Sequence, residues 1–238
     1  MFYPGFNKSS GTVKIELKAA IASFDGILRP SNYMISGSFA ASLLFSKTFV
    51  YDDFDLYFNK KADLFHAIKL LNESPCFELK YKTKRALTYL HIKTKDKIQL
   101  IKKIHTTPHH LVYAHDFHNC GVAYCSKKES FYISKEALHA WNNQLLILNR
   151  TPLESKSLPA LHFFQTISIL FSRIKKYSHR YSLELDFDSK VKVDNYRNKC
   201  IYLIKNSSFQ HPLTSISYSG AIYSFQEFIK NEIYMYEL

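Results

Sequence analysis

Hydrophobic and polar positions alternate with two different periods along this chain, and the changes of period mark the predicted elements. Between residues 12 and 28 the apolar side chains recur at near-helical spacing, which predicts an amphipathic helix before the first strand. Residues 33–35 (YMI) form a short apolar run that predicts a buried strand. Residues 39–45 predict a helix with Ser38 near its N-cap. Residues 50–58 combine strong strand formers with acids, so a second strand is expected there.

The following hundred residues continue this alternation of helical and extended patterns. Apolar positions on one face predict a helix over 61–72, and period-two patterns predict a three-stranded meander over 77–104. A shorter series follows: a helix at 109–114 after Pro108, strands at 115–125 and 131–133, and a helix capped by Ser134. Farther along, helices are expected at 158–177 and at 219–238.

This order of elements predicts an α+β fold in which helices flank a mixed β-sheet. The segment 149–159 is polar and holds two prolines, so it is the expected domain boundary. We therefore expect a catalytic domain over 1–150 and a smaller, mainly helical C-terminal part over 151–238.

Charge and cysteine usage narrow the class of protein. The chain has 238 residues and a net charge of +12, which favours an anionic partner such as nucleic acid, although lysines also keep an aromatic-rich protein soluble. The 4 cysteines show no paired CxxC spacing, which indicates free thiols and a cytoplasmic protein. The start of the chain lacks a signal-peptide pattern, and no apolar run of about 18 residues predicts a membrane span.

Two acids in the second strand are the first candidate functional residues. Asp53 and Asp55 are two positions apart, so in a strand their side chains share one face. Adjacent carboxylates repel each other, and a divalent cation with a preference for oxygen ligands, such as Mg²⁺, removes that penalty. An edge strand with two solvated acids is the alternative interpretation.

The turn before the first predicted helix is the second candidate. Gly37 and Ser38 stand between the strand and the helix, where backbone N–H groups and the helix dipole stabilise a phosphate. A phosphate-binding turn together with metal-binding acids is the equipment of phosphoryl or nucleotidyl transfer.

These residues resemble the signature of the polymerase-beta-like nucleotidyltransferase superfamily: Gly-Ser on a strand-to-helix turn, then hydrophobic-Asp-hydrophobic-Asp-hydrophobic. A longer pattern is similar to a viral and eukaryotic branch of nucleotidyltransferase-like proteins. That pattern comprises 98–101 (IQLI), 116–124 (DFHNCGVAY), Asn149-Arg150 and 176–181 (KYSHRY). The resemblance implies a nucleotidyltransferase fold, two Mg²⁺ ions with Mn²⁺ as an alternative, and a nucleoside triphosphate such as ATP as substrate.

Two-metal transfer generally needs a third carboxylate near the attacking hydroxyl. Gln99 lies in a well-formed predicted strand where an acid is expected, but an amide can neither neutralise a metal nor act as a base. Asp116 lies at the start of the next predicted strand, and the longer pattern favours it. Pairing of Asp116 with His115 or His118 is the purely structural alternative.

Basic residues supply candidate binding sites for phosphates. Nine Lys or Arg and two acids fall between Glu78 and Lys103, with Lys80, Lys82 and Lys84 expected on one strand face near Tyr81 and Tyr89. This suits a nucleic-acid track, although edge strands are also rich in lysine. Three further cations lie on one stripe of the 158–181 helix and could bind the triphosphate: Arg173, Lys176 and Arg180. Five histidines between 105 and 118 lack a recognised zinc spacing and are better explained as a surface cluster or phosphate contacts.

The predicted activity is therefore Mg²⁺-dependent transfer of a nucleoside monophosphate from an NTP to a hydroxyl acceptor. In this prediction Gly37 and Ser38 bind the triphosphate, whereas Asp53, Asp55 and Asp116 hold metal. The charge favours an RNA acceptor, either tRNA or another RNA 3′ end. Two alternatives remain: a catalytically silent fold that binds nucleic acid, and a toxin-like enzyme that nucleotidylates a protein.

Overall fold

The computed structural model describes residues 10–46, 51–149, 160–206, 216–218 and 221–223. The chain divides into two compact units, Met1–Asn143 and Gln144–Leu238. None of the helices within the described ranges is both long and apolar enough to cross a membrane.

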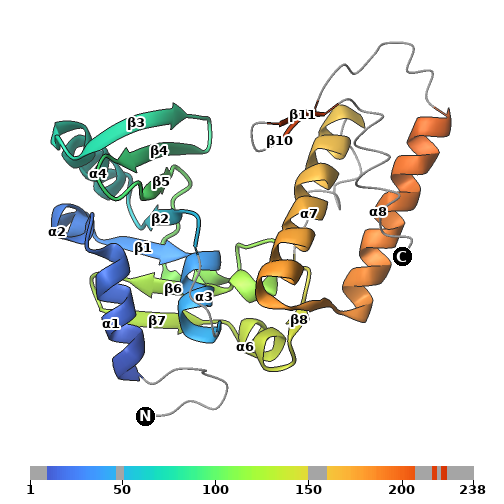
Figure 1. Cartoon of the computed structure of the whole chain (residues 1–238), viewed down its shortest axis with the longest axis horizontal. Coiled ribbons are helices and arrows are strands. Elements are labelled where there is room, and N and C mark those ends of the chain that lie inside the picture. Colours follow the sequence, from blue (N-terminus) through green and yellow to red (C-terminus); the bar gives the residue numbers. More distant parts are fainter. Residues whose placement is uncertain (1–9, 47–50, 150–159, 207–215, 219–220, 224–238) are drawn as a thin grey trace. The chain divides into compact units, whose positions relative to one another are not determined.

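A seven-stranded mixed sheet forms the first unit, in the order β3-β4-β5-β2-β1-β6-β7 (Figure 1). All its neighbouring strands are antiparallel except β2 and β5, which are parallel. The strands are β1 (Tyr33–Ser36), β2 (Phe54–Phe58), β3 (Phe77–Lys82), β4 (Ala86–His91), β5 (Lys97–Ile101), β6 (Val122–Cys125) and β7 (Ser130–Ile133). The predicted α+β fold with a mixed sheet flanked by helices is thus confirmed.

Helices cover one face of this sheet with the main hydrophobic core. They are α1 (Ser10–Ile21), α2 (Asp25–Leu28), α3 (Ser38–Phe45), α4 (Lys61–Glu73) and α6 (Lys135–Asn142). Alternate strand residues such as Phe54, Leu56 and Tyr89 are buried in this core, as period-two patterns require. Phe39 and Phe45 anchor α3 to it, and the Phe45 ring stacks on Trp141 of α6 at 5.4 Å.

The opposite face of the sheet is covered over part of its width. Helix α5 (Pro108–Val112) packs against β1, β6 and β7 there, and a small second core contains Met34, Leu111 and Ala123. Over β2, β5 and β4 the side chains on this face, including Asp55 and Gln99, are half-buried. Among the described residues, the sheet therefore has one face that helices largely cover and one face that is open beside α5.

Several predicted elements differ in detail from the observed ones. The single strand expected at 115–125 is a 3₁₀ turn, η2 (His118–Cys120), followed by β6. Turn hydrogen bonds replace the strand ladder, because Cys120 N donates to Phe117 O at 3.1 Å and Gly121 N donates to His118 O at 2.8 Å. The predicted cap at Ser134 is present, since its Oγ accepts from Ala137 N at 3.0 Å.

The second unit contains two long helices, α7 (Ala160–Tyr181) and α8 (Phe187–Asn206). Two short strand pairs accompany them: β8 (Leu145–Leu146) with β9 (Glu184–Leu185), and β10 (Ile216–Tyr218) with β11 (Ala221–Tyr223). Strand β11 falls where a terminal helix was predicted for 219–238, and the rest of that prediction lies outside the described residues, as do Arg150 and residues 158–159.

Candidate active site

The turn between β1 and α3 has a conformation that depends on glycine. Gly37 has φ 93° and ψ −148°, a region that is essentially restricted to glycine because an L side chain is strained there. Gly37 is the N-cap of α3 and Ser38 is its first residue, so Ser38 lies near the N-cap as predicted. The first N–H groups of a helix have no acceptor within it, so this turn presents donors and the positive end of the helix dipole.

His115 and Val122 hold this turn from neighbouring segments. The Val122 carbonyl accepts from Ser36 Oγ at 2.6 Å and from Gly37 N at 3.4 Å. Ser36 Oγ also lies 2.7 Å from His115 Nε2. Because the serine proton is used for Val122, His115 must donate from Nε2. Sequence reasoning did not assign these three residues a joint role, since their pairing follows from a sheet in which β1 lies beside β6.

The two acids lie next to this turn on the open face. β2 begins at Phe54, so Asp53 directly precedes the strand and Asp55 lies within it. A Cβ added to Gly37 would lie 3.8 Å from Asp55 Oδ2 and 3.7 Å from His115 Cε1. The structure thus brings Gly37 and Asp55 together, as the sequence motif predicts.

Gln99 completes this cluster from β5. It is the direct cross-strand partner of Asp55, and its Nε2 donates to Asp53 Oδ2 at 2.6 Å. The Gln99 amide contacts the Asp53 carboxylate, and Gln99 itself is in register with Asp55, so both acids lie beside Gln99 on the same face of the sheet. The expected third-acid position on β5 is occupied by a neutral hydrogen-bond donor.

The donor set fits one magnesium ion. Mg²⁺ is typically held by one or two carboxylates, with substrate phosphates and water filling its remaining positions. Asp53 and Asp55 supply that number of carboxylates. Among the described residues, no group of three or more His, Cys, Asp or Glu side chains is arranged to hold a metal. A metal role for Asp116, which follows His115 in the chain, stays a prediction.

The predicted phosphate-binding cations belong to the second unit. Arg173, Lys176 and Arg180 lie on α7, whose apolar side buries Ile167 and Phe171. A cavity of about 310 Å³ occurs in the same unit, and none of these three cations lines it. Its walls include Phe171, Ile174, Asp194 and Arg197. The role of the α7 cations in triphosphate binding stays a prediction.

The structure differs in two respects from the nucleic-acid track that was predicted on β3. Tyr89 was expected to stack on bases, but its side chain is only 1% exposed and its hydroxyl donates to Asn72 Oδ1 at 2.8 Å. The expected lysine face is interrupted because the register shifts between Leu79 and Tyr81, which places Lys80 in a bulge. Tyr81 itself is 69% exposed.

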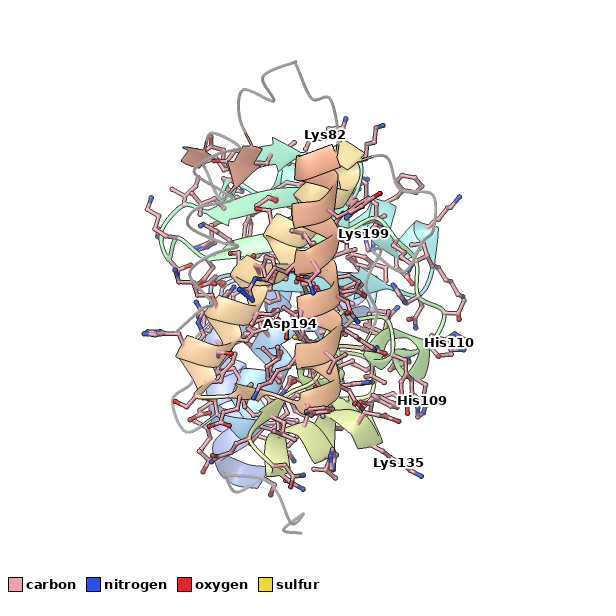
Figure 2. All side chains as sticks on the ribbon, turned by 90° about the vertical axis from the view of Figure 1, so that its right-hand side faces the viewer. Lys82, His109, His110, Lys135, Asp194 and Lys199 are labelled. Atoms are coloured by element: carbon pink, nitrogen blue, oxygen red, sulfur yellow. The ribbon has the colours of Figure 1, made fainter. Side chains whose placement is uncertain are left out.

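The histidines between 105 and 118 are spread over different environments. His109 and His110 point outward from α5 (Figure 2), whereas His105 is buried and His115 belongs to the turn described above. These four histidines therefore lie in separate environments in the described part of the chain.

Comparison with known proteins identifies the family. Residues 10–144, more than half of the chain, match the family described as Gad2, Gabija anti-defense 2 family protein. The chain belongs to this family. The matched region spans all seven strands of the sheet, together with the Gly37 turn, Asp53, Asp55 and Gln99.

Solved structures of CCA-adding enzymes have a similar fold. An ATP complex matches with a TM-score of 0.59 and 15% identity, and an apo form matches with 0.58 and 13%. A Thermotoga maritima CCA-adding enzyme complexed with tRNA matches with 0.57 and 14%. These matches cover 85–86% of this chain but only 48% of each enzyme, so the chain spans about half their length.

At such low identity these similarities establish the fold alone, which is that of nucleotidyltransferases. Membership of the predicted superfamily and of its viral and eukaryotic branch stays a prediction. No curated protein matches this chain.

Proposed function

We propose that this Gad2-family chain is a nucleotidyltransferase that moves a nucleoside monophosphate from an NTP to an RNA hydroxyl. The observation that carries the proposal is the cluster of Gly37, Asp55 and Gln99-bound Asp53 on the open face of the sheet. A glycine turn at a helix N-terminus suits phosphate, and two adjacent carboxylates suit a divalent cation. The CCA-adding enzymes of similar fold were solved with ATP, with CTP and with tRNA, which makes NTP and RNA reasonable substrates to test.

The proposed reaction assigns separate tasks to the chain's residues. The oxygen of the acceptor hydroxyl attacks the α-phosphorus, the bond between the α- and β-phosphates breaks, and pyrophosphate leaves. The Gly37 turn would bind the phosphates, Asp53 and Asp55 would hold Mg²⁺, and Asp116 would take up the hydroxyl proton. Bound Mg²⁺ would supply neutralisation of the developing phosphate charge. Gln99 would fix the orientation of the Asp53 carboxylate, because the two are already hydrogen-bonded.

We infer that the biological role is anti-defence, as the family description states, and that nucleotidyl transfer is its chemistry. A variant that lacks transfer activity should then fail to counter Gabija defence in cells while accumulating to the wild-type level. If Asp55→Ala still counters that defence, binding rather than catalysis performs the role.

The direct test is turnover by the full-length chain. Labelled NTPs, Mg²⁺ and RNA with a free 3′ hydroxyl should give extended RNA and pyrophosphate. Asp53→Ala and Asp55→Ala should reduce this signal to background, and Asp55→Ala should do so without lowering metal-free stability, because it removes one of two repelling carboxylates. Asp52→Ala is the matched control, since it removes the same charge from an exposed neighbour. Near-wild-type turnover in Asp55→Ala would refute the assigned site, and label on protein instead of RNA would identify a protein acceptor.

A further inference from the structure

A row of side chains crosses the open face of the sheet from the acid pair to the sheet edge. The register places Asp55 opposite Gln99, and Gln99 opposite Thr88. Thr88 in turn lies opposite Tyr81 on β3, the edge strand. Strands are spaced about 4.8 Å apart, so the three gaps put the Tyr81 backbone roughly 14 Å from that of Asp55. We call these four residues the cross-sheet row.

The cross-sheet row is half-buried at its inner members and exposed at its outer end. Helices α1, α3 and α4 contribute to the core on the opposite face, whereas α5, among the described elements, packs on this face against β1, β6 and β7. Gln99 and Thr88 are half-buried, and the Tyr81 ring at the outer end is 69% exposed. The row therefore offers an amide, a hydroxyl and an aromatic ring, in that order, outward from Asp55.

Positive charge lies near the outer end of this row, although Lys80 is paired with Glu78 at 2.6 Å. Exposed cations lie on β3 and on the turn that joins it to β4: Lys80, Lys82, Lys84 and Arg85. Lys97, on β5, is exposed as well and lies one step along the strand face from Gln99. Lysines and a bulge also protect an edge strand from pairing with other strands. That role explains the lysines, but it does not require an exposed aromatic ring in register with the acid pair.

We propose that the cross-sheet row is the path of a single-stranded nucleic-acid acceptor. The 3′ hydroxyl lies at Asp53 and Asp55, the sugar-phosphate chain passes Gln99 and Thr88, and a base stacks on Tyr81. Aromatic stacking beside a positively charged groove is how proteins bind single strands without reading sequence. The inference rests on the proposed function for placing the 3′ hydroxyl at the acids. Binding of nucleic acid along the row can be tested without measuring turnover.

Binding and cross-linking test the path. With 5′-labelled single-stranded RNA and no NTP, Tyr81→Ala should weaken binding at least about fivefold, as expected for one lost base stack, and Tyr81→Phe should restore it. The photoreactive residue p-benzoylphenylalanine in place of Tyr81 should cross-link to nucleotides near the 3′ end. The same residue in place of Phe65, which is 64% exposed on α4 of the covered face, should not.

The outcomes separate this inference from the proposed function. Unchanged RNA affinity in Tyr81→Ala, or cross-linking equal to that at position 65, overturns the path even if the wild type extends RNA. Cross-linking from position 81 to a protein instead of RNA also overturns it. Loss of binding in Tyr81→Ala, with 3′-end cross-links and wild-type NTP affinity, supports the path even if no extension is detected.

Discussion

Gly37 is the residue whose identity the site constrains most clearly. A Cβ at this position would meet its protein neighbours only at ordinary contact distances of 3.7 and 3.8 Å. The constraint is conformational, because the φ of 93° and ψ of −148° fall in a region that costs other residues about 1–3 kcal/mol.

Gly37→Ala should therefore lower the free energy of unfolding by about 1–3 kcal/mol. It should also weaken NTP binding beyond that loss, because relief of the strain moves the turn that presents the N–H groups. Urea denaturation and NTP titration at a temperature where the variant remains folded measure the two effects. Gly26→Ala is the matched control, since space is open around Gly26 and its φ lies outside the positive range. NTP affinity equal to wild type would argue against a phosphate role for the turn.

The position of Gln99 in the candidate site could not be predicted from the sequence. Its strand was predicted correctly, and its lack of charge argued against any role in the site. The parallel pairing of β2 and β5 makes it the neighbour of both acids, and its amide donates to Asp53. That parallel register joins segments some 45 residues apart, so no local pattern reveals it. Asp116 was preferred as the third acid on sequence resemblance, and its role remains a prediction.

At the scale of elements, strong periodic patterns in the sequence predicted helices and strands correctly, but the sequence did not predict local irregularities such as bulges and 3₁₀ turns. The helix predicted at 61–72 is α4, and the predicted meander is β3, β4 and β5. The bulge in β3 was missed because it is defined by the register with β4, and the 3₁₀ turn before β6 was missed although its hydrogen bonds are local. Tyr89 was expected to stack on bases. Because side chains of β4 alternate between the two faces of the sheet, Tyr89 instead lies in the core beneath α4, where its hydroxyl contacts Asn72.

The segment that follows β5 carries a pH-sensitive group. Burial lowers the pKa of His105, and Lys103 and His110 lower it further. The unfolded chain consequently binds a proton more readily than the folded chain, so the free energy of unfolding should fall as the pH drops below about 6.5. One such proton changes that free energy by at most about 1.4 kcal/mol per pH unit.

Urea denaturation between pH 7.5 and pH 5 measures this dependence. His105→Gln should reduce the fall of the free energy of unfolding at acid pH. The substitution also removes the packing of the imidazole ring against Tyr57, whose ring centroid is 5.5 Å away. His139→Gln, on the exposed face of α6, serves as the control and should keep the wild-type pH dependence. An unchanged slope in His105→Gln would show that other groups dominate acid sensitivity.

At the scale of the whole molecule, charge is distributed unevenly. Residues 1–150 carry 21 basic and 12 acidic side chains, whereas residues 151–238 carry 11 and 8. The excess lies with the part of the chain that contains the seven-stranded sheet. An anionic partner is therefore expected to bind mainly to the first unit, where β3 and the neighbouring turns expose most of the lysines between Glu78 and Lys103.

RNA binding by this chain should depend steeply on salt, because phosphate neutralisation releases counterions. On a log–log plot the association constant should fall with a slope of about 0.7 per phosphate contacted on a single strand. Replacing Lys80, Lys82 and Lys84 with Gln should flatten that slope while leaving NTP affinity unchanged. Lys80 should contribute least, since its Nζ is already 2.6 Å from Glu78 Oε2.

The charge-matched control replaces Lys127, Lys128 and Lys135, which are exposed near β7 at the opposite sheet edge. Equal flattening in both triple variants would indicate diffuse attraction, and a salt-independent interaction would favour a protein acceptor.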